Sequence, residues 1–414
     1  MSNNTTREAM ATNNNDKTLN VPPLRFPEFS GEWEEHTLSE YLEFKNGLNP
    51  DAKRIGSGLP FISVMDILSE GVINYDNIRG KVNATEKEIE CFGVKDGDLL
   101  FQRSSETLED VGRANVYMDN RTAIYGGFVI RGRKIGNYDP LFFKYLLATP
   151  LARKRTCRMG AGAQHFNIGQ EGLSKISLYF PSIEEQRKIA GFLSLIDERI
   201  ATQNKIIEKL QSLIKGLSQQ LLSSENDWIL YRLDDLAQIK SGYSGIQVSY
   251  QTPYKVSRIE TISKHCIDIQ RIGYVEFIPE SYKLNVGNIL FSNINSVQYI
   301  GNTAYLDKDY GLYHGMNLLR IIPNTTIVRP RFLHLLLCTD WAINHFQTIC
   351  NKAVSQASIN QTALGKSRYP IPPMSVQQQI CSMFELTERK LGNEQEYISC
   401  LQQQKRYLLQ EMFI

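Results

Sequence analysis

The feature that most constrains this 414-residue sequence is an internal duplication. Matching residues lie 195 positions apart at the start of the two copies and 190 or 191 apart further along, as in Trp33 and Trp228, Gly47 and Gly242, Pro140 and Pro330, and Gln186 and Gln377. Chance is a poor explanation for an offset that drifts so little. Each copy is too long to be one unit of a solenoid, so we expect two similar domains.

Each copy begins with a globular part in which short apolar segments alternate with turns rich in Gly, Asn and Asp. In the first copy we predict strands at residues 59–64, 98–102, 115–118 and 128–131, and a helix at 140–148 that starts with proline. The second copy repeats this order with strands at 287–292, 303–306 and 317–322 and a helix at 330–338. The predicted fold class is therefore mixed α/β (α+β).

Each copy ends in a long segment with a heptad pattern. Residues 183–222 contain no proline, and apolar residues occupy every one of the positions 193, 196, 200, 207, 210, 214, 217 and 221. Gln203 is the polar member of this seam. Residues 376–413 keep a similar stripe, which Thr387, Glu394 and Lys405 interrupt. Steps that alternate between three and four residues are typical of a coiled coil.

The two helices allow two arrangements: one face of a larger helical bundle, or an intramolecular coiled coil. We favour an antiparallel coiled coil, because each helix is the other's nearest partner. It would form a spacer of roughly 50–60 Å between two domains related by a pseudo-two-fold axis. The layout is a disordered polar tail at 1–20, domains at 21–180 and 226–371, and spacer helices at 181–225 and 372–414.

Composition and motifs exclude several classes of protein. The polar start has no signal-peptide core, and no apolar run is long enough to cross a membrane. Seven cysteines without a CxxC pair favour reduced thiols and a cytoplasmic location. The segment around Gly365 lacks the earlier glycine of a phosphate-binding loop, and no metal-ligand spacing is present. We therefore expect a non-catalytic chain without a metal or cofactor of its own.

Polar and basic residues follow several predicted strand ends, where they are suited to phosphates and base edges. The candidates in the first copy are Lys45, Arg54, Gln102, Arg103, Ser104, Ser105, Arg153, Arg155, Arg158, Gln164, His165 and Asn167. Those in the second copy are Lys240, Tyr243, Asn293, Asn295, Ser296, Gln356, Ser358 and Asn360. Ordinary loop polarity, and solvated helix charge for residues 153–158, remain the alternative explanation.

A family resemblance rests on the string that opens the first long helix. Residues 181–190 read Pro-Ser-Ile-Glu-Glu-Gln-Arg-Lys-Ile-Ala, and residues 23–29 with Trp33 form a Pro- and Phe-rich approach. In the second copy Gln377 is kept, whereas Val376 replaces the Glu and Cys381 the Ala. Together with the duplication, this string resembles the specificity subunits of type I restriction–modification enzymes.

The resemblance implies two target recognition domains that read the halves of a bipartite, asymmetric site on double-stranded DNA. Two methyltransferase subunits would carry S-adenosylmethionine, and restriction subunits, where present, would use ATP and Mg²⁺. The implied partner and spacer positions are Glu185, Gln186, Ile189, Leu193, Ile196, Ile200, Ile207, Leu210, Gln377, Ile380 and Leu401. The main alternative is a coiled-coil scaffold that binds proteins and has no DNA specificity.

Overall fold

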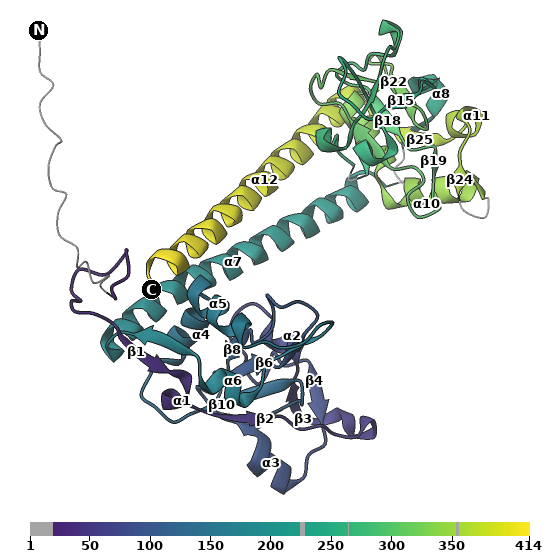
Figure 1. Ribbon diagram of the computed structural model, residues 1–414. Coiled ribbons are helices and arrows are strands. Elements are labelled where there is room, and N and C mark those ends of the chain that lie inside the picture. The colour runs from purple at the N-terminus through teal and green to yellow at the C-terminus, as the bar shows by residue number, and fades with distance from the viewer. Residues whose placement is uncertain (1–19, 224–227, 264, 353–355) are drawn as a thin grey trace, which may run out of the picture. The chain divides into compact units, whose positions relative to one another are not determined.

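The computed structural model describes residues 20–223, 228–263, 265–352 and 356–414 (Figure 1). The predicted tail at 1–20 lies almost wholly outside these ranges, as do most of the residues between the first helix and the second domain. The chain divides into two compact units. Unit 1 holds residues up to 204 together with 397–414, and unit 2 holds residues 205–396. Within the described ranges, no helix has both the length and the apolarity needed to cross a bilayer.

Unit 1 contains two four-stranded sheets. The first is antiparallel and has the order β2 (Leu42–Asn46), β10 (Val129–Lys134), β6 (Leu99–Gln102) and β8 (Ala114–Val116). The second has the order β4 (Gly80–Val82), β3 (Ile55–Ile62), β9 (Ala123–Tyr125) and β5 (Gly93–Val94), with β3 and β9 parallel. Two short pairs join β1 (Glu34–Thr37) to β12 (Ser177–Phe180) and β7 (Ser104–Ser105) to β11 (Phe166–Asn167).

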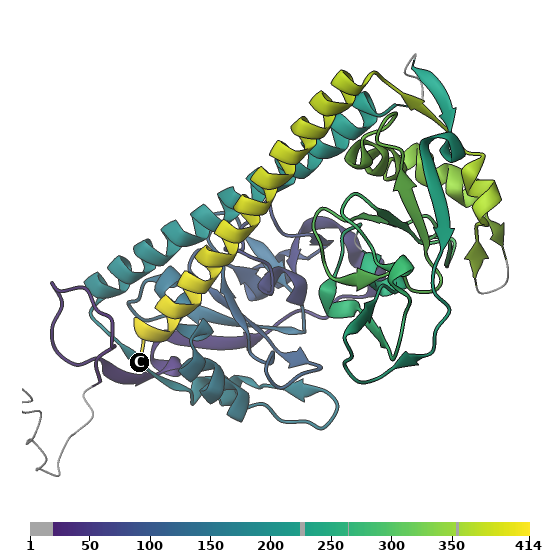
Figure 2. The same cartoon turned by 90° about the horizontal axis from the view of Figure 1, so that it is seen from above.

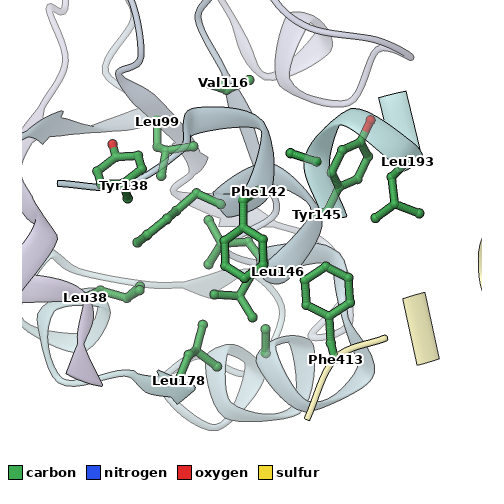
Figure 3. Packing of buried hydrophobic residues seen from close by; sticks show 14 of the residues in the cluster. Leu38, Leu99, Val116, Tyr138, Phe142, Tyr145, Leu146, Leu178, Leu193 and Phe413 are labelled. Atoms are coloured by element: carbon green, nitrogen blue, oxygen red, sulfur yellow. The ribbon is translucent and has the colours of Figure 1, made fainter. Parts of the chain in front are cut away.

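The helices of unit 1 are mostly short. They are α1 (Leu38–Tyr41), η1 (Ala52–Arg54), α2 (Val64–Ile67), α3 (Glu86–Phe92), α4 (Pro140–Ala148), α5 (Pro150–Arg158) and α6 (Gln170–Ser174). The core gathers around α4, whose Phe142 is fully buried against Trp33 and stacks on Phe413, with ring centroids 5.5 Å apart (Figure 3). The last residues of the chain are therefore part of the core of unit 1.

Unit 2 repeats, in its first sheet, the strand order of the first sheet of unit 1, which confirms the duplication. Its antiparallel sheet runs β14 (Ala237–Ser241), β22 (Leu319–Pro323), β18 (Ile289–Phe291) and β20 (Thr303–Tyr305). Its second sheet runs β15 (Gln247–Val248), β17 (Gly273–Val275), β16 (Tyr254–Val256) and β21 (Leu312–Tyr313), again with one parallel pair. The remaining strands are β13 (Ile229–Arg232) with β25 (Arg368–Ile371), and β19 (Ile294–Asn295), β24 (Ala357–Ser358) and β23 (Asn351–Lys352).

The helices of unit 2 follow the same sequence order. They are α8 (Leu233–Leu236), η2 (Ile259–Ile262), η3 (Ile269–Arg271), η4 (Glu280–Tyr282), α9 (Pro330–Leu337), α10 (Asp340–Ile349) and α11 (Gln361–Gly365). The helix that starts at Pro330 corresponds to α4 of unit 1, and its Phe332 takes the buried position of Phe142.

Two long helices, α7 (Ile183–Leu221) and α12 (Met374–Glu411), contribute to both units (Figures 1 and 2). In unit 1 the start of α7 packs with the end of α12, through Ile196, Ile200 and Leu401. In unit 2 the end of α7 packs with the start of α12, through Leu217 and Phe384. Along α7 the seam is buried from Leu193 to Gln203 and half-buried from Ile207 to Leu221, and the two helices form an antiparallel coiled coil.

The predicted strand at 59–64 ends too late. β3 stops at Ile62, and a capping box follows in which Ser63 N–H donates to the carboxylate of Asp66 over 2.8 Å. This cap starts α2 at Val64, because it satisfies backbone donors that a strand would have paired elsewhere. The helix predicted at 140–148 matches the bounds of α4.

Candidate nucleic-acid interface

Four segments of unit 1 meet around the turn that joins β9 to β10. We call residues 47–49, 102–105, 126–128 and 161–167 the loop cluster of unit 1. The β7–β11 pair holds the second segment to the fourth, with Ser104 opposite Asn167. Arg103 N–H donates to the carbonyl of Phe128 over 2.9 Å, which ties the second segment to the turn. Two segments that hold candidates of the sequence analysis, 102–105 and 164–167, thus come together beside this turn.

In each unit, one glycine lets its loop lie very close to the backbone of another turn: Gly47 beside Gly126 in unit 1, and Gly242 beside Gly315 in unit 2. A Cβ on Gly47 would stand 2.1 Å from the carbonyl oxygen of Gly126. In unit 2 a Cβ on Gly242 would stand 1.8 Å from the carbonyl oxygen of Gly315. In each unit the next residue, Leu48 or Tyr243, forms an isolated bridge to that same turn. Glycine at these positions lets the loop lie against the turn, so both units present the turn in the same way.

In unit 2 the corresponding polar residues lie on the three-stranded sheet. Ile294 pairs with Ser358 and Asn295 with Ala357, so the two predicted segments are neighbours here as well. The side-chain oxygen of Asn360 caps α11 by accepting from Ala363 N–H over 2.7 Å, and Asn360 is exposed to solvent. The repeat therefore builds two comparable polar surfaces, one on each unit.

The sequence matches the family described as the type I restriction modification DNA specificity domain, twice, at residues 30–212 and 225–401. The chain belongs to this family. The two matches cover most of its length, and the resemblance found in residues 181–190 is confirmed.

Two relatives and one solved structure are similar to this specificity subunit. It is 38% identical over 193 residues to an inferred MjaX specificity subunit of a type I restriction enzyme from Methanocaldococcus jannaschii, an alignment that spans only 45% of each protein. It is 23% identical over 392 residues to the MjaVIII specificity subunit of the same organism, covering 86% of this chain and 85% of the relative. The crystal structure of a type I specificity subunit from M. genitalium shares the fold, with a TM-score of 0.59 and 15% identity over 95% of this chain and 99% of that one.

Several basic candidates of this specificity subunit are engaged within unit 1. Arg54 forms a two-pronged ion pair with Glu88, whose carboxylate raises the pKa of the guanidinium. The Arg54 guanidinium in turn lowers the pKa of Glu88 to about 2. The amine of Lys45 lies 2.9 Å from the sulfur of Cys91 and 5.4 Å from the ring centroid of Phe92.

The basic cluster on α5 divides into inward and outward residues. Arg153 donates to the carbonyls of Glu109 and Val111 over 2.8 and 2.6 Å, and its burial lowers the pKa of its guanidinium. Arg155 pairs with Glu35 over 2.8 Å and bonds Ser177. Arg158 is exposed at the end of the helix. Of the three predicted arginines, Arg158 is the one most available to a phosphate.

The other candidates fall into three groups by exposure. Gln164, His165, Asn167, Lys240, Ser296, Gln356 and Asn360 are exposed. Arg103, Ser104, Ser105, Tyr243, Asn293, Asn295 and Ser358 are half-buried. Gln102 is buried, and its side-chain amide donates to the carbonyl of Ser104 over 2.9 Å. Among the described residues, no group of three His, Cys, Asp or Glu side chains is placed to hold a metal ion.

The predicted partner residues at the helix ends hold each helix to its own domain. Gln186 accepts from Asp139 N–H over 3.1 Å and donates to the carbonyl of Pro181 over 3.0 Å. Gln377 does the same in unit 2, with Arg329 N–H at 2.7 Å and the Pro372 carbonyl at 2.9 Å. In the seam, Ile189, Leu193, Ile196, Ile200, Ile380 and Leu401 are buried, whereas Ile207 and Leu210 are half-buried.

Glu185 forms an ion pair that unit 2 lacks. Its carboxylate is 1% exposed and accepts from Arg25 Nε over 2.8 Å and from Arg25 Nη2 over 2.7 Å. Val376 occupies the corresponding position in unit 2 and packs against the apolar core. The sequence analysis named Glu185 but described the segment around Arg25 only as rich in Pro and Phe, and their separation of 160 residues hid the pairing.

Proposed function

We propose that this chain supplies the DNA-sequence specificity of a type I restriction–modification complex and has no catalytic role in it. Each unit would read one half of a bipartite, asymmetric site. The observation that carries the proposal is the duplicated specificity domain, in which the same fold presents different polar residues. In the first copy these are Arg103, Ser105 and Asn167, and at the corresponding positions of the second Asn293, Asn295 and Ser358. A shared framework with different polar side chains fits two half-sites of different sequence.

The coiled coil would set the number of unread base pairs between the two half-sites. α7 has 39 residues and α12 has 38, and both are continuous. At about 1.5 Å per residue such a helix is longer than one turn of DNA, about 34 Å. The two half-sites would then be separated by a spacer whose length follows the helix length.

The outer face of the coiled coil is suited to a protein partner. In unit 1 a groove of about 390 Å³ is lined by Phe192, Leu195 and Tyr397, which are exposed, and by their neighbours on α7 and α12. We assign this face to the methyltransferase subunits, of which two would bind, together with restriction subunits where the system has them. S-adenosylmethionine, and ATP with Mg²⁺, would be held by those partners. The complex would act on DNA in the cytoplasm.

The test is co-expression with a methyltransferase subunit in a host that lacks adenine methylation, followed by methylation mapping of its DNA. We expect methyladenine in one bipartite motif, only when this chain is present. Exchange of residues 226–371 for the second domain of a related subunit should change one half of the motif and leave the other half and the spacer unchanged. A stable complex without site-specific methylation, or a change in both halves, would contradict the proposal.

A further inference from the structure

Phe128 is a large apolar side chain that the fold of unit 1 keeps in solvent. It is 68% exposed, while Tyr125 and Val129 on either side are fully buried. The sequence analysis placed Phe128 at the start of a strand, but β10 begins at Val129 and Phe128 lies in the preceding turn. Single exposed apolar residues are common on proteins. Phe128 differs from most of them because several hydrogen bonds fix the backbone of the turn that carries it.

The turn that carries Phe128 is fixed from several directions. Gly126 N–H donates to the carbonyl of Ile62 and Val129 N–H to that of Gly126, each over 2.9 Å. The Phe128 carbonyl accepts from Arg103 N–H over 2.9 Å. The guanidinium of Arg103 also donates to the carbonyl of Gly127 over 3.3 Å. A side chain on a backbone held in this way loses little further freedom when it binds, which favours a binding role.

Two polar side chains of the loop cluster, Asn49 and Arg103, lie against the turn that carries Phe128. A Cβ on Gly127 would stand 1.8 Å from the side-chain oxygen of Asn49, so the amide of Asn49 lies directly against the turn. The guanidinium of Arg103 also lies against the turn, at the carbonyl of Gly127. An aromatic ring that projects among amide and guanidinium groups is suited to a ligand that combines stacked flat rings, hydrogen-bonding edges and phosphates.

Resting on the proposed function, we infer that Phe128 inserts its ring into the DNA half-site read by unit 1, between two base pairs that it partly unstacks. Apolar side chains that enter a base step in this way bend the duplex. The polar loops around the turn would then contact the phosphates and base edges on either side of the opened step.

Unit 2 lacks this ring. The turns correspond because Leu48 N–H donates to the carbonyl of Tyr125 and Tyr243 N–H donates to that of His314, each over 3.0 Å. This register places Asn317 opposite Phe128, and Asn317 has a positive φ of 64°. Asparagine adopts that conformation more readily than most residues and carries no apolar ring. The turn of unit 2 therefore offers no aromatic ring for insertion at this position.

The test compares Phe128→Ala with Phe128→Trp in the complex with its methyltransferase subunits, on a duplex that carries the mapped motif. The matched control is Ile135→Ala, since Ile135 is 59% exposed just beyond the other end of β10 and lies outside the loop cluster. Affinity is measured by titration, and DNA bending by energy transfer between dyes on the two ends of the duplex. Thermal unfolding of the three variants should match the parent, because both side chains are exposed.

We expect Phe128→Ala to bind about 5- to 100-fold more weakly, the range given by losing one stacked base, and to bend the duplex less. Phe128→Trp and Ile135→Ala should keep the affinity and the bend. Unchanged affinity in Phe128→Ala, a loss of affinity with the bend retained, or an equal loss in Ile135→Ala would overturn the insertion. Failure of the parent complex to bind any specific duplex would instead contradict the proposed function.

Discussion

Corresponding core positions of the two units hold different titratable residues. His314 of unit 2 takes the place of Tyr125, and His334 takes the place of Lys144. His314 is 1% exposed and His334 is 4% exposed, and burial lowers the pKa of the first to about 4 and of the second to about 3. The two units share a framework but should respond to pH in different pH ranges.

Burial favours the neutral ring of both histidines, and the hydrogen bond of His334 with Arg331 also requires the neutral form. His334 Nδ1 accepts from Arg331 Nη1 over 2.8 Å, and the guanidinium of Arg331 also pairs with Glu388. A protonated ring has no acceptor to offer Arg331 and would place a second positive charge beside it. The histidines of unit 1, His36 and His165, are in contact with solvent. Acidification should therefore act on unit 2 first.

The largest expected effect is a selective loss of unit 2 stability between pH 6.5 and pH 5. The unfolded histidines bind protons below pH 6.5 while the folded ones stay neutral, so stability falls as pH falls. At pH 5 each histidine costs about 2 kcal/mol, about 4 kcal/mol together. Hydrogen exchange, corrected for its intrinsic pH dependence, should show β14 and β22 opening before β2 and β10.

His334→Gln tests the cause, because a glutamine oxygen can accept from Arg331 and does not titrate. About half of the pH-dependent loss should disappear in this variant. Equal protection of both units at pH 5, or an unchanged pH profile in His334→Gln, would show that the histidines do not set the difference. Glu40 and Glu88 of unit 1, whose pKa values are lowered to about 2, contribute little above pH 5, because their stabilisation is lost only as pH falls below the unfolded value near 4.5.

The second difference between the units is the buried ion pair of Arg25 with Glu185. Arg25→Met should destabilise unit 1 by about 3 kcal/mol, because it leaves the Glu185 carboxylate buried without its counter-charge. The double variant with Glu185→Val, which copies the valine of unit 2, should recover most of this loss. Urea denaturation measures both. A double variant as unstable as the single one would assign the effect to lost packing of the N-terminal segment.

Parts of these results follow from sequence patterns, and others do not. The repeat offset and the heptad spacing predicted the two domains and the coiled coil, because both patterns are set by local periodicity. The partners of Arg54 and Arg155 were missed, since Glu88 and Glu35 lie 34 and 120 residues away and only the tertiary fold brings them near. Exposed basic residues and paired ones look alike in a sequence. The exposure of Phe128 was missed because an apolar residue at the start of a predicted strand is expected to be buried in the core.

The third prediction concerns a feature that the units share. Gln186→Ala and Gln377→Ala should each cost about 2 kcal/mol, because each leaves a buried backbone N–H and a carbonyl unpaired where the helix meets its domain. Gln377→Ala should lose slightly more stability than Gln186→Ala, since Gln377 also donates to the carbonyl of Ile327 over 3.0 Å. Urea denaturation of the two variants measures this. Loss in one unit only would mean that the two junctions, although alike in geometry, differ in energy.

The smallest expected effect is an alkaline gain in unit 1. Burial lowers the pKa of Lys144 to about 8, and its amine donates to the carbonyl of Gly71 over 2.6 Å. Above pH 8 the folded lysine releases its proton before the unfolded one does, so stability rises with pH up to the unfolded value near 10.5. Because part of the side chain still meets water, we expect a gain of about 1 kcal/mol between pH 7.5 and 9.5. Above this range the buried tyrosines oppose the gain in stability, since burial raises the pKa of Tyr125 to about 12.

The variant Lys144→Met tests this assignment. It should be more stable than the parent at pH 7.5, and its stability should not rise between pH 7.5 and 9.5. Parallel stability curves for the parent and Lys144→Met would show that Lys144 is charged throughout. The difference in pH response between the two units would then rest on the histidines of unit 2 alone.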